Sequence, residues 1–358
     1  MPSQAVRLID VARAAGVSMP TASQVMNGTG RVADDTRRRV LEAARDLDYR
    51  PNALARSVAS GRSRTIGVLA ENAAGAFCMP VLIGINRELS SHDFASILFD
   101  AHHDPELRHE HVRHMLDRHV EGIIVIGEGA DVSIAPLGVD FVGPVVQAYG
   151  PQESDEAVSV HPDEYFGGVL AARRLIEMGR TRIAHVTAEK TLASTQERQR
   201  GFLRTLAEAG LEPSALLHGS FSRRWGLEAA SQIVREAPET DAVFAGSDAI
   251  AIGLAAGLES HGRNVPADVA IVGYDNLAGY SDDTQPYLES VDPRLTEVGH
   301  LAARHLIGAL AGEDSPLVAV EPRLAPGATT RGDADPTRQA LVDTLLRSIT
   351  APPVGQTP

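Results

Sequence analysis

Apolar positions in the first fifty residues recur with helical spacing in three short segments. This spacing predicts helices over residues 8–15, 19–27 and 34–47. Gly16 can adopt a positive φ between the first two helices, and Ser18 is a favourable N-cap for the second. Two short helices joined by a tight, glycine-containing turn indicate a helix-turn-helix, whose second helix enters the major groove of DNA.

From residue 65 onward, short apolar runs alternate with amphipathic helical patterns. The apolar runs are Thr65–Ala70, Ala95–Phe99, Gly122–Ile126, Pro144–Ala148, Ile183–Thr187, Ala242–Ala245 and Val269–Gly273. The helical patterns cover 80–91, 105–119, 164–178, 197–210, 225–236, 248–261 and 294–311. This alternation predicts an α/β fold of doubly wound parallel sheets, and its repetition around residue 162 predicts two similar lobes.

Charge divides the chain into two unequal parts. Residues 1–64 hold eleven arginines and six acidic residues, a net charge of +5, whereas the remaining residues carry −19 and bring the total to −14. Confinement of the positive charge to one short end indicates that this end meets a polyanion. The hydrophobic fraction of 43% is enough for a sizeable core, and the aromatic fraction of 4% predicts that aliphatic residues fill it.

The cysteine content and the apolar runs bear on the compartment. Cys78 is the only cysteine, so the chain forms no internal disulfide, which suits a reducing environment. The first residues lack the basic-then-apolar layout of a secretion signal, and no run of eighteen apolar residues occurs. The sequence therefore predicts a soluble, cytoplasmic protein that does not associate with a membrane.

Several segments near the amino terminus carry a more specific signal. They are Asp10–Ser18, Thr21–Gly28, Thr36–Val40 and Tyr49–Arg56, followed by Thr65–Leu69 at the start of the larger part. With these motifs the chain resembles the lactose-repressor/galactose-repressor (LacI-type) family of bacterial transcription regulators, from about residue 6 to residue 332. The resemblance adds a hinge helix after the helix-turn-helix headpiece and a two-lobed body similar to periplasmic binding proteins, with a ligand cleft between the lobes.

The resemblance also implies the domain boundaries. They are 1–50 for the helix-turn-helix DNA-binding domain, 51–64 for the hinge helix and linker, 65–332 for the effector-binding body, and 333–358 for a C-terminal tail. Within the body, lobe one comprises 65–162 and about 293–322, and lobe two comprises 163–292 and about 323–332. The tail aligns apolar residues over barely two heptads, which is short for a coiled coil, so a homodimer is expected rather than a tetramer.

By position in the family motif, three residues of the second helix read bases: Met19, Pro20 and Gln24. Phosphate or base-edge contacts are implied for Thr21, Ser23, Asn27 and Arg31, and further DNA contacts for Leu8, Asn52, Ala55, Arg56 and Val58. Val58 stands where the family inserts an apolar wedge, usually leucine, into the minor groove. Gln24 replaces the usual arginine, which shifts readout from guanine toward adenine. Ala33 replaces the usual serine cap of the third helix, so Asp34 is expected to cap it instead.

In the body, polar residues at the carboxyl ends of the predicted strands are the candidates for ligand binding. The resemblance implies effector contacts for Phe77, Tyr149, Arg198, Phe221, Ser247 and Asp275. Arg198 and Asp275 together suit a polyhydroxylated ligand, because a guanidinium and a carboxylate each make paired hydrogen bonds. Alternatives stay open: Arg198 and Asp275 could form an ion pair between the lobes, Asp248 could cap a helix or contact the ligand, and the two phenylalanines could simply pack.

Several positions depart from the family's sugar-binding pattern. Gly75 and Ala76 replace Asn-Pro, Tyr149 and His161 stand where aspartate is frequent, and Ser247 stands where asparagine is usual. The effector is therefore expected to be a sugar or a related metabolite, with a modified sugar, a glycoside or another small molecule left open.

Other kinds of site were weighed and set aside. Seven histidines fall between 92 and 119, and His111 and His114 lie one helical turn apart, but without a nearby thiolate or carboxylate cluster a solvated helix face is favoured over a metal site. The segment 122–129 is glycine-rich but lacks the Gly-Lys-Ser/Thr of a phosphate loop. No catalytic constellation is apparent, so neither an enzyme nor a cofactor is expected.

These observations together predict a homodimeric transcription regulator, in the first instance a repressor. Two headpieces would bind a pseudo-palindromic DNA operator, and a carbohydrate-like effector would act from between the lobes. Whether the effector releases DNA or strengthens its binding is open. The main alternative is a ligand-binding or transport-associated protein of the periplasmic-binding type, which would need an export signal and no basic headpiece; an enzyme is the third possibility.

Overall fold

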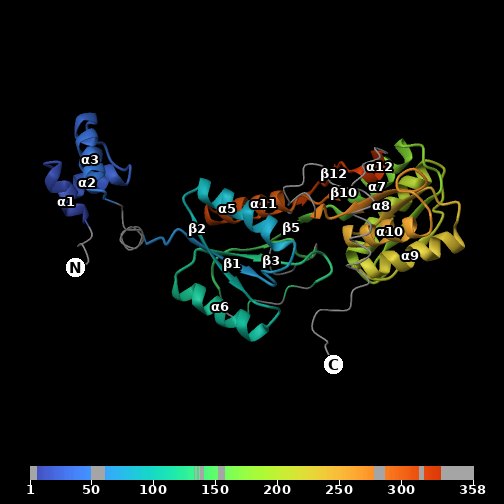
Figure 1. The fold of residues 1–358 in the computed structure, drawn as a ribbon. Coiled ribbons are helices and arrows are strands. Elements are labelled where there is room, and N and C mark those ends of the chain that lie inside the picture. Colours follow the sequence, from blue (N-terminus) through green and yellow to red (C-terminus); the bar gives the residue numbers. More distant parts are fainter. Residues whose placement is uncertain are drawn as a thin grey trace, which may run out of the picture. The chain divides into compact units, whose positions relative to one another are not determined.

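The computed structural model describes residues 6–49, 61–132, 134, 137, 141–151, 158–277, 287–313 and 318–331 (Figure 1). The chain divides into two compact units, Met1–Arg64 and Thr65–Pro358, which we call the headpiece and the body. The predicted hinge helix and C-terminal tail lie outside the described residues. Within the described residues, no helix is both long enough and apolar enough to cross a membrane.

The headpiece contains the three predicted helices, α1 (Leu8–Ala14), α2 (Met19–Met26) and α3 (Asp34–Asp46). Their apolar faces meet in a small core around Val11, Ala22, Val25 and Val40. The turn between α1 and α2 contains Gly16 at φ 63°, and the Ser18 hydroxyl accepts a hydrogen bond from the Thr21 N–H at 3.3 Å. The predictions for this turn and for the N-cap of α2 are therefore confirmed.

The start of α3 differs from expectation. The helix begins at Asp34, so Ala33 occupies the N-cap position and no side chain caps the helix there. The prediction that Asp34 acts as the cap was wrong, because Asp34 already has its place in the first helical turn. Asp34 and Asp35 still stabilise this end through the helix dipole, and Asp35 pairs with Arg38 at 2.5 Å.

The body contains two six-stranded sheets, which define two lobes. The first sheet has the order β11-β5-β4-β3-β1-β2, and its strands are all parallel. Its strands are β1 (Thr65–Ala70), β2 (Ala95–Asp100), β3 (Gly122–Ile126), β4 (Val145–Ala148), β5 (Val158–Pro162) and β11 (Val318–Val320). Helices α5 (Cys78–Ser91) and α11 (Leu295–Leu310) cover one face and α6 (Pro105–Asp117) lies on the other (Figure 1).

The second sheet has the order β12-β10-β9-β8-β6-β7, with β12 antiparallel to β10. Its strands are β6 (Ile183–Thr187), β7 (Leu216–His218), β8 (Ala242–Ala245), β9 (Ala270–Tyr274), β10 (Glu289–Asp292) and β12 (Arg323–Ala325). Helices α7 (Glu164–Glu177) and α8 (Ala193–Glu208) cover one face, and α9 (Arg223–Glu236) and α10 (Asp248–Ser260) cover the other. A short helix α12 (Ala328–Arg331) follows β12.

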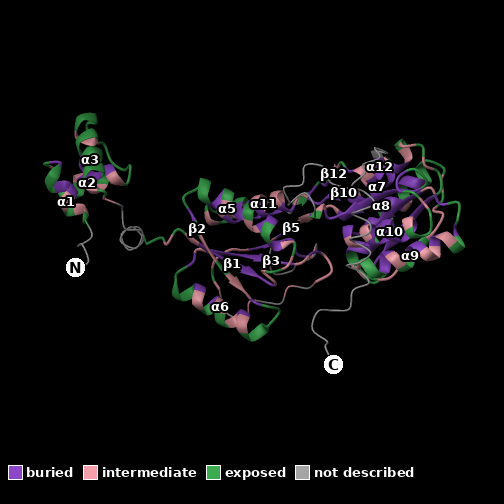
Figure 2. Ribbon diagram, in the orientation of Figure 1, coloured by how far each residue is buried: buried purple, intermediate pink, exposed green. Residues whose placement is uncertain are grey.

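Both lobes bury their sheets on two faces, as doubly wound sheets require. Along β1, Val68 packs toward α5 and α11 whereas Leu69 packs toward α6, and both side chains are fully buried. Exposed residues gather on the outward faces of α6 and α9 (Figure 2). The alternation of β and α segments in the sequence thus predicted the layer structure of each lobe correctly.

Glycines allow the covering helices to approach each other closely. A Cβ atom at Gly201 of α8 would collide with the backbone oxygen of Tyr165 in α7, and one at Gly168 would collide with that of Arg198. Gly84 and Gly299 play the same part between α5 and α11. Backbone contact of this kind fixes where α8, and therefore Arg198, lies in the second lobe.

The chain passes between the lobes three times, after β5, after β10 and after β11. Hydrogen bonds tie these crossing segments together. The Asp163 N–H donates to the Val320 oxygen at 2.9 Å, and the Asp292 carboxylate accepts from the Arg294 N–H and from the Arg323 guanidinium at 3.0 Å. The three segments therefore form one connected hinge region.

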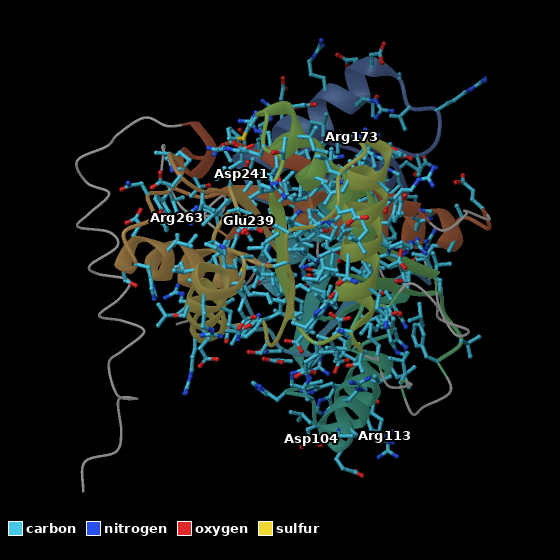
Figure 3. All side chains as sticks on the ribbon, turned by 90° about the vertical axis from the view of Figure 1, so that its right-hand side faces the viewer. Asp104, Arg113, Arg173, Glu239, Asp241 and Arg263 are labelled. Atoms are coloured by element: carbon cyan, nitrogen blue, oxygen red, sulfur yellow. The ribbon has the colours of Figure 1, made fainter. Side chains whose placement is uncertain are left out.

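Two charged side chains, Asp241 and Arg263, bond backbone groups near the amino ends of the second sheet's strands. Asp241, before β8, accepts hydrogen bonds from the N–H groups of Thr181 and Arg182, and Arg263 donates to the backbone oxygens of Pro238 and Thr240 (Figure 3). Asp241 and Arg263 thus have partners within the protein, which is what a structural role requires.

Candidate functional site

The exposed side of α2 carries the residues that were predicted to read DNA. Met19 is 53% exposed, and Pro20 and Gln24 are also exposed. The Gln24 side chain lies against Gly30, which has a φ of 74° in the following turn. Gln24 thus projects from the middle of the helix, where a side chain could reach a base edge in the major groove.

Some of the residues predicted to contact phosphates or base edges form hydrogen bonds within the headpiece. Thr21 bonds the Ser18 hydroxyl at 2.8 Å, and the Asn27 amide donates to the Ser23 hydroxyl at 3.2 Å. Arg31 is exposed, and Leu8 is half-buried against the headpiece core. The remaining predicted DNA contacts, Asn52, Ala55, Arg56 and Val58, lie outside the described residues.

In the body, Arg198 is the centre of a buried polar network at the carboxyl ends of β8 and β9. Its side chain is 5% exposed, and its guanidinium donates to the Glu164 carboxylate at 2.7 Å and to the Gly246 oxygen at 2.6 Å. It also lies 3.5 Å from the centre of the Tyr274 ring. Burial lowers the pKa of Arg198, but the charge and the hydrogen bond of Glu164 raise it above its ordinary value, so Arg198 stays charged.

Glu164 is the ionic partner of Arg198, and the sequence reasoning missed it. It stands in the first turn of α7, in the same lobe as Arg198. The alternative of an ion pair between the lobes made by Arg198 and Asp275 was therefore wrong, since both residues belong to the second lobe and Arg198 pairs with Glu164. A signal was present, because a glutamate directly after Asp163 follows a strand end, but nothing in its spacing linked it to Arg198.

Asp275 lies beside this network. It follows β9, is 6% exposed and has a φ of 108°, a backbone conformation that residues other than glycine rarely adopt. Burial raises the pKa of Asp275 well above its usual range; the positive charge of Arg198 opposes this, whereas the charges of Asp248 and Glu164 add to it. A buried carboxyl group on a strained turn is more typical of a binding site than of a structural one.

Ser247 and Asp248, at the start of α10, have different structural roles. The Ser247 hydroxyl is the N-cap and accepts a hydrogen bond from the Ile250 N–H at 3.2 Å. The Asp248 carboxylate accepts from the Leu277 N–H at 2.8 Å and from the Ser290 hydroxyl at 2.6 Å. Asp248 is therefore not the cap; it holds the turn that carries Asp275.

Tyr149 brings the first lobe to this network. It follows β4 at a φ of 59° and is 4% exposed. Burial raises the pKa of Tyr149 well above its ordinary value, and the charges of Asp275 and Glu164 raise it further. Those two residues belong to the second lobe, so the Tyr149 phenol lies where the two lobes face each other. We call Tyr149, Glu164, Arg198, Asp248 and Asp275 the interlobe site.

A direct contact also joins the lobes near this site. Asp131, in the segment after β3, accepts hydrogen bonds from both the N–H and the hydroxyl of Ser194 in the first turn of α8, the former at 2.9 Å. This helix begins at Ala193, four residues before the predicted start at 197, because small polar residues rather than apolar ones form its first turn. The predicted start of this helix was therefore late by one turn.

We expect Asp131→Ala to loosen this contact between the lobes. A hydrogen bond to a charged group contributes about 1.5–3 kcal/mol, so amide exchange at Ser194 should accelerate by about tenfold or more. Hydrogen exchange measured by mass spectrometry would detect the change. Glu208→Ala, on the exposed carboxyl end of the same helix, is the control and should leave exchange at Ser194 unaltered.

The two predicted aromatic contacts have different surroundings. Phe77 is half-buried and packs edge-to-face on Tyr149, with ring centres 5.4 Å apart. Phe221 is 38% exposed, and its ring centre lies 5.9 Å from the Arg198 guanidinium carbon. Both aromatic rings therefore adjoin residues of the interlobe site.

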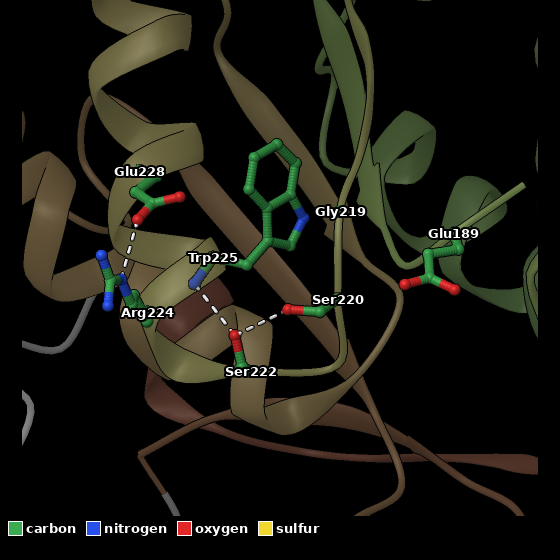
Figure 4. Close-up of a pocket in the computed structure, with 7 residues that line it drawn as sticks. All are labelled: Glu189, Gly219, Ser220, Ser222, Arg224, Trp225 and Glu228. Carbon is green, nitrogen blue, oxygen red and sulfur yellow. Dashed lines mark hydrogen bonds and ion pairs between the residues drawn. The ribbon is translucent and has the colours of Figure 1, made fainter.

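A shallow hollow opens on the second lobe at the start of α9 (Figure 4). It is lined by Glu189, Gly219, Ser220, Ser222, Arg224, Trp225 and Glu228. Arg224 is paired with Glu228 at 3.0 Å, and the Trp225 indole N–H donates to the Thr187 oxygen at 2.9 Å. Arg224 and Trp225 are thus bonded within the protein, whereas the interlobe site gathers several buried charged groups, so the interlobe site is the better candidate for ligand binding.

The carboxyl edge of the first sheet carries a second buried ion pair, which the sequence reasoning also missed. Glu71, after β1, bonds Arg108 of α6, and both side chains are almost fully buried. Glu128, after β3, pairs with His103 at 3.1 Å and accepts from the Asn72 amide at 3.1 Å. Burial raises the pKa of Glu71, an effect that the charge of Arg108 opposes.

The histidine-rich segment makes local contacts. The His111 ring packs at a tilt against Phe99, with ring centres 4.8 Å apart, and bonds the Asp100 backbone oxygen at 3.1 Å. No group of three or more potential metal ligands occurs in the described ranges.

Comparison with known proteins agrees with this geometry. Residues 63–323 match the family described as periplasmic binding proteins and sugar binding domain of LacI family, and residues 7–52 match bacterial regulatory proteins, lacI family. The HTH-type transcriptional repressor PurR of Erwinia tasmaniensis is 32% identical over 321 residues, which are 88% of this chain and 94% of that protein. Catabolite control protein A of Priestia megaterium is 33% identical over 306 residues, 84% of this chain and 91% of that protein.

Solved structures show the same architecture. The transcriptional regulator CelR in complex with cellobiose superposes with a TM-score of 0.61 at 28% identity, covering 90% of this chain and 99% of that one. The Lac repressor dimer bound to operator and an anti-inducer gives a TM-score of 0.69 at 23% identity, covering 91% and 99%. From its helix-turn-helix headpiece, its two-lobed body and these matches over most of its length, the chain belongs to the LacI family of bacterial regulatory proteins.

Proposed function

We propose that this protein is a transcriptional repressor that binds a pseudo-palindromic DNA operator as a homodimer and is controlled by a small hydroxylated effector at the interlobe site. The observation that carries the effector part is the buried Arg198–Glu164–Asp275 cluster, which meets Tyr149 of the other lobe. A ligand held by groups from both lobes binds best at one relative arrangement of them. Its binding energy can therefore bias the lobes, and through them the DNA-binding segments.

The proposed regulator agrees with the relatives. PurR and catabolite control protein A are by name a repressor and a control protein, and the CelR structure contains cellobiose. Two copies of the headpiece would present two α2 helices to successive major grooves, which requires a two-fold symmetric site. Backbone strain at Tyr149 and Asp275 supports a binding role for these residues, because such strain concentrates at functional sites.

The proposed roles in DNA binding divide α2 and its following turn into two classes. We expect Gln24→Ala to lose about 1–3 kcal/mol of binding free energy mainly at one base position, because Gln24 is placed to pair with a base edge. We expect Arg31→Ala to weaken binding to all sequences alike and to reduce the salt dependence by about one unit. Binding to a randomised DNA library at several salt concentrations measures both effects.

Asp46→Ala provides a matched control at the far end of α3, and it should retain the selected sequence. Equal losses on selected and random DNA for both Gln24→Ala and Arg31→Ala would refute the assignment of Gln24 to base reading. Failure of the full chain to select any sequence would refute the proposed function itself.

A further inference from the structure

Carboxylates outnumber guanidiniums among the buried side chains at the carboxyl edges of the two sheets. Within the described residues, the buried carboxylates there are Glu71, Glu164, Asp248, Asp275 and Asp292, of which Asp292 pairs with the exposed Arg323. Two buried guanidiniums accompany them, and each is already bonded, Arg108 to Glu71 and Arg198 to Glu164. Within the described ranges, Asp248 and Asp275 therefore have no ion-pair partner of their own.

Hydrogen bonds and nearby charges surround these two buried aspartates. Asp248 faces the Ser290 hydroxyl and the Leu277 N–H, with Arg198 and Asp292 as the nearby charges, and burial raises its pKa to about 6. Asp275 faces Arg198, Asp248 and Glu164, and burial raises its pKa further. Both shifts arise because burial disfavours a carboxylate that has no cation of its own, so a bound positive group would favour the ionised form of each aspartate.

Buried polar atoms that make no hydrogen bond with the described part of the chain lie at the same edges. Among them are Glu71 Oε1, Thr187 Oγ1 and Thr195 Oγ1. Thr187 ends β6 and contacts Gly246, whose oxygen accepts from Arg198, and Thr195 lies one helical turn before Arg198. Buried polar atoms without partners indicate that a ligand or water completes them. The hydroxyls suit a hydroxylated ligand.

These features bear on the charge of the ligand. An anionic group such as phosphate or carboxylate would meet two carboxyl groups and one guanidinium already held by Glu164. A positive group would meet two carboxylates in a buried setting, where charge-assisted hydrogen bonds are strongest.

We propose that the effector is a polyhydroxylated amine, whose ammonium group binds beside Asp275 and Asp248 while its hydroxyls bond Arg198 and the neighbouring threonines. This inference rests on the proposed function only in placing the effector at the interlobe site. It predicts that the site binds positively charged ligands in preference to neutral or negative ones. The proposed function alone does not require this preference.

Calorimetric titration of the full chain with charge-matched probes tests the proposal. The probes are D-glucosamine and its disaccharide as amines, their N-acetyl forms as neutral analogues, and D-glucose 6-phosphate as an anion. We expect an amine to bind at least about tenfold more tightly than its N-acetyl form. The N-acetyl form loses one charge-assisted contact, and a tenfold change in Kd corresponds to about 1.4 kcal/mol. The Asp275→Asn variant should lose this preference, and the exposed Glu208→Gln variant should keep it.

The pH dependence has a defined sign. Bound ammonium lowers the pKa of Asp248 from about 6 and that of Asp275 from its raised position, so binding releases protons. Amine affinity should therefore rise from about pH 5 to about pH 7, a range in which amino groups with an ordinary pKa near 8 remain largely protonated. Asp248→Asn should weaken this rise, which gives a second readout if Asp275→Asn folds poorly.

Tighter binding of an N-acetyl or phosphate probe than of the amine would overturn the proposal. The absence of amine binding at about 10 mM would also overturn it, because nearly all specific effector sites bind more tightly than that. A neutral or anionic ligand that binds the wild type, fails to bind Arg198→Met and alters operator binding would overturn the charge of the effector and leave the proposed function standing. Operator binding that no ligand of the interlobe site alters would overturn the proposed function instead.

Discussion

Arg198→Ala is expected to destabilise the body by about 3–5 kcal/mol and to abolish effector binding, because it leaves the buried Glu164 carboxylate without its cation. The variant also removes the donor to the Gly246 oxygen and the positive charge that Asp275 faces. Denaturant unfolding of the full chain, followed by fluorescence of Trp225 in the second lobe, measures the loss of unfolding free energy.

Arg204→Ala is the matched control, since Arg204 lies on the same helix and forms an exposed pair with Glu208 at 2.7 Å. An exposed pair of this kind contributes about 0.3–0.5 kcal/mol. The double variant Arg198→Met with Glu164→Gln should recover much of the stability without restoring ligand binding, because it removes both buried charges. Equal stability losses for Arg198→Ala and Arg204→Ala would contradict the buried network.

Gly201→Ala is expected to cost about 3 kcal/mol and to weaken effector binding as well, because an added Cβ would collide with the Tyr165 backbone oxygen and push α8 away from α7. Backbone cannot yield as a flexible side chain does, so the helix that carries Arg198 must move. Unfolding and calorimetric titration measure the two effects.

Gly210→Ala separates this collision from the intrinsic cost of replacing a glycine. Gly210 follows α8 at a φ of 69°, and a Cβ there meets no atom within 4 Å. Only the strained φ should matter, at about 1 kcal/mol, and effector binding should be unchanged. Loss of effector binding in Gly210→Ala, or its retention in Gly201→Ala, would contradict the role of the α7–α8 contact.

The sequence predicted the layers of the body well because buried parallel strands such as Ile183–Thr187 are continuous apolar runs. It failed for short or polar strands. β7 has three residues with partial exposure, and β10 consists of Glu-Ser-Val-Asp, whose polar side chains are buried by tertiary bonds to Thr330 and Asp248. The local pattern of apolar and polar residues does not indicate such long-range partners.

The same limit applies to the candidate site. Family position gave Arg198, Asp275 and Tyr149, and the structure brings these three together. Glu164, Glu71 and Asp131 were missed, because their partners lie 34, 37 and 63 residues away in the chain. Pairings across such separations depend on the order of the strands in the sheets, which cannot be derived from a single sequence. The base-reading and hinge contacts remain predictions.

The most direct test of this account is the affinity of the full chain for its selected operator, with and without a ligand that stabilises the body. A ligand of the interlobe site should change the operator Kd by about 5–150-fold, which corresponds to a coupling free energy of about 1–3 kcal/mol. The headpiece-deleted chain 65–358 should bind the ligand and no operator. An operator Kd that stays constant at saturating ligand, or operator binding by the body alone, would contradict the account.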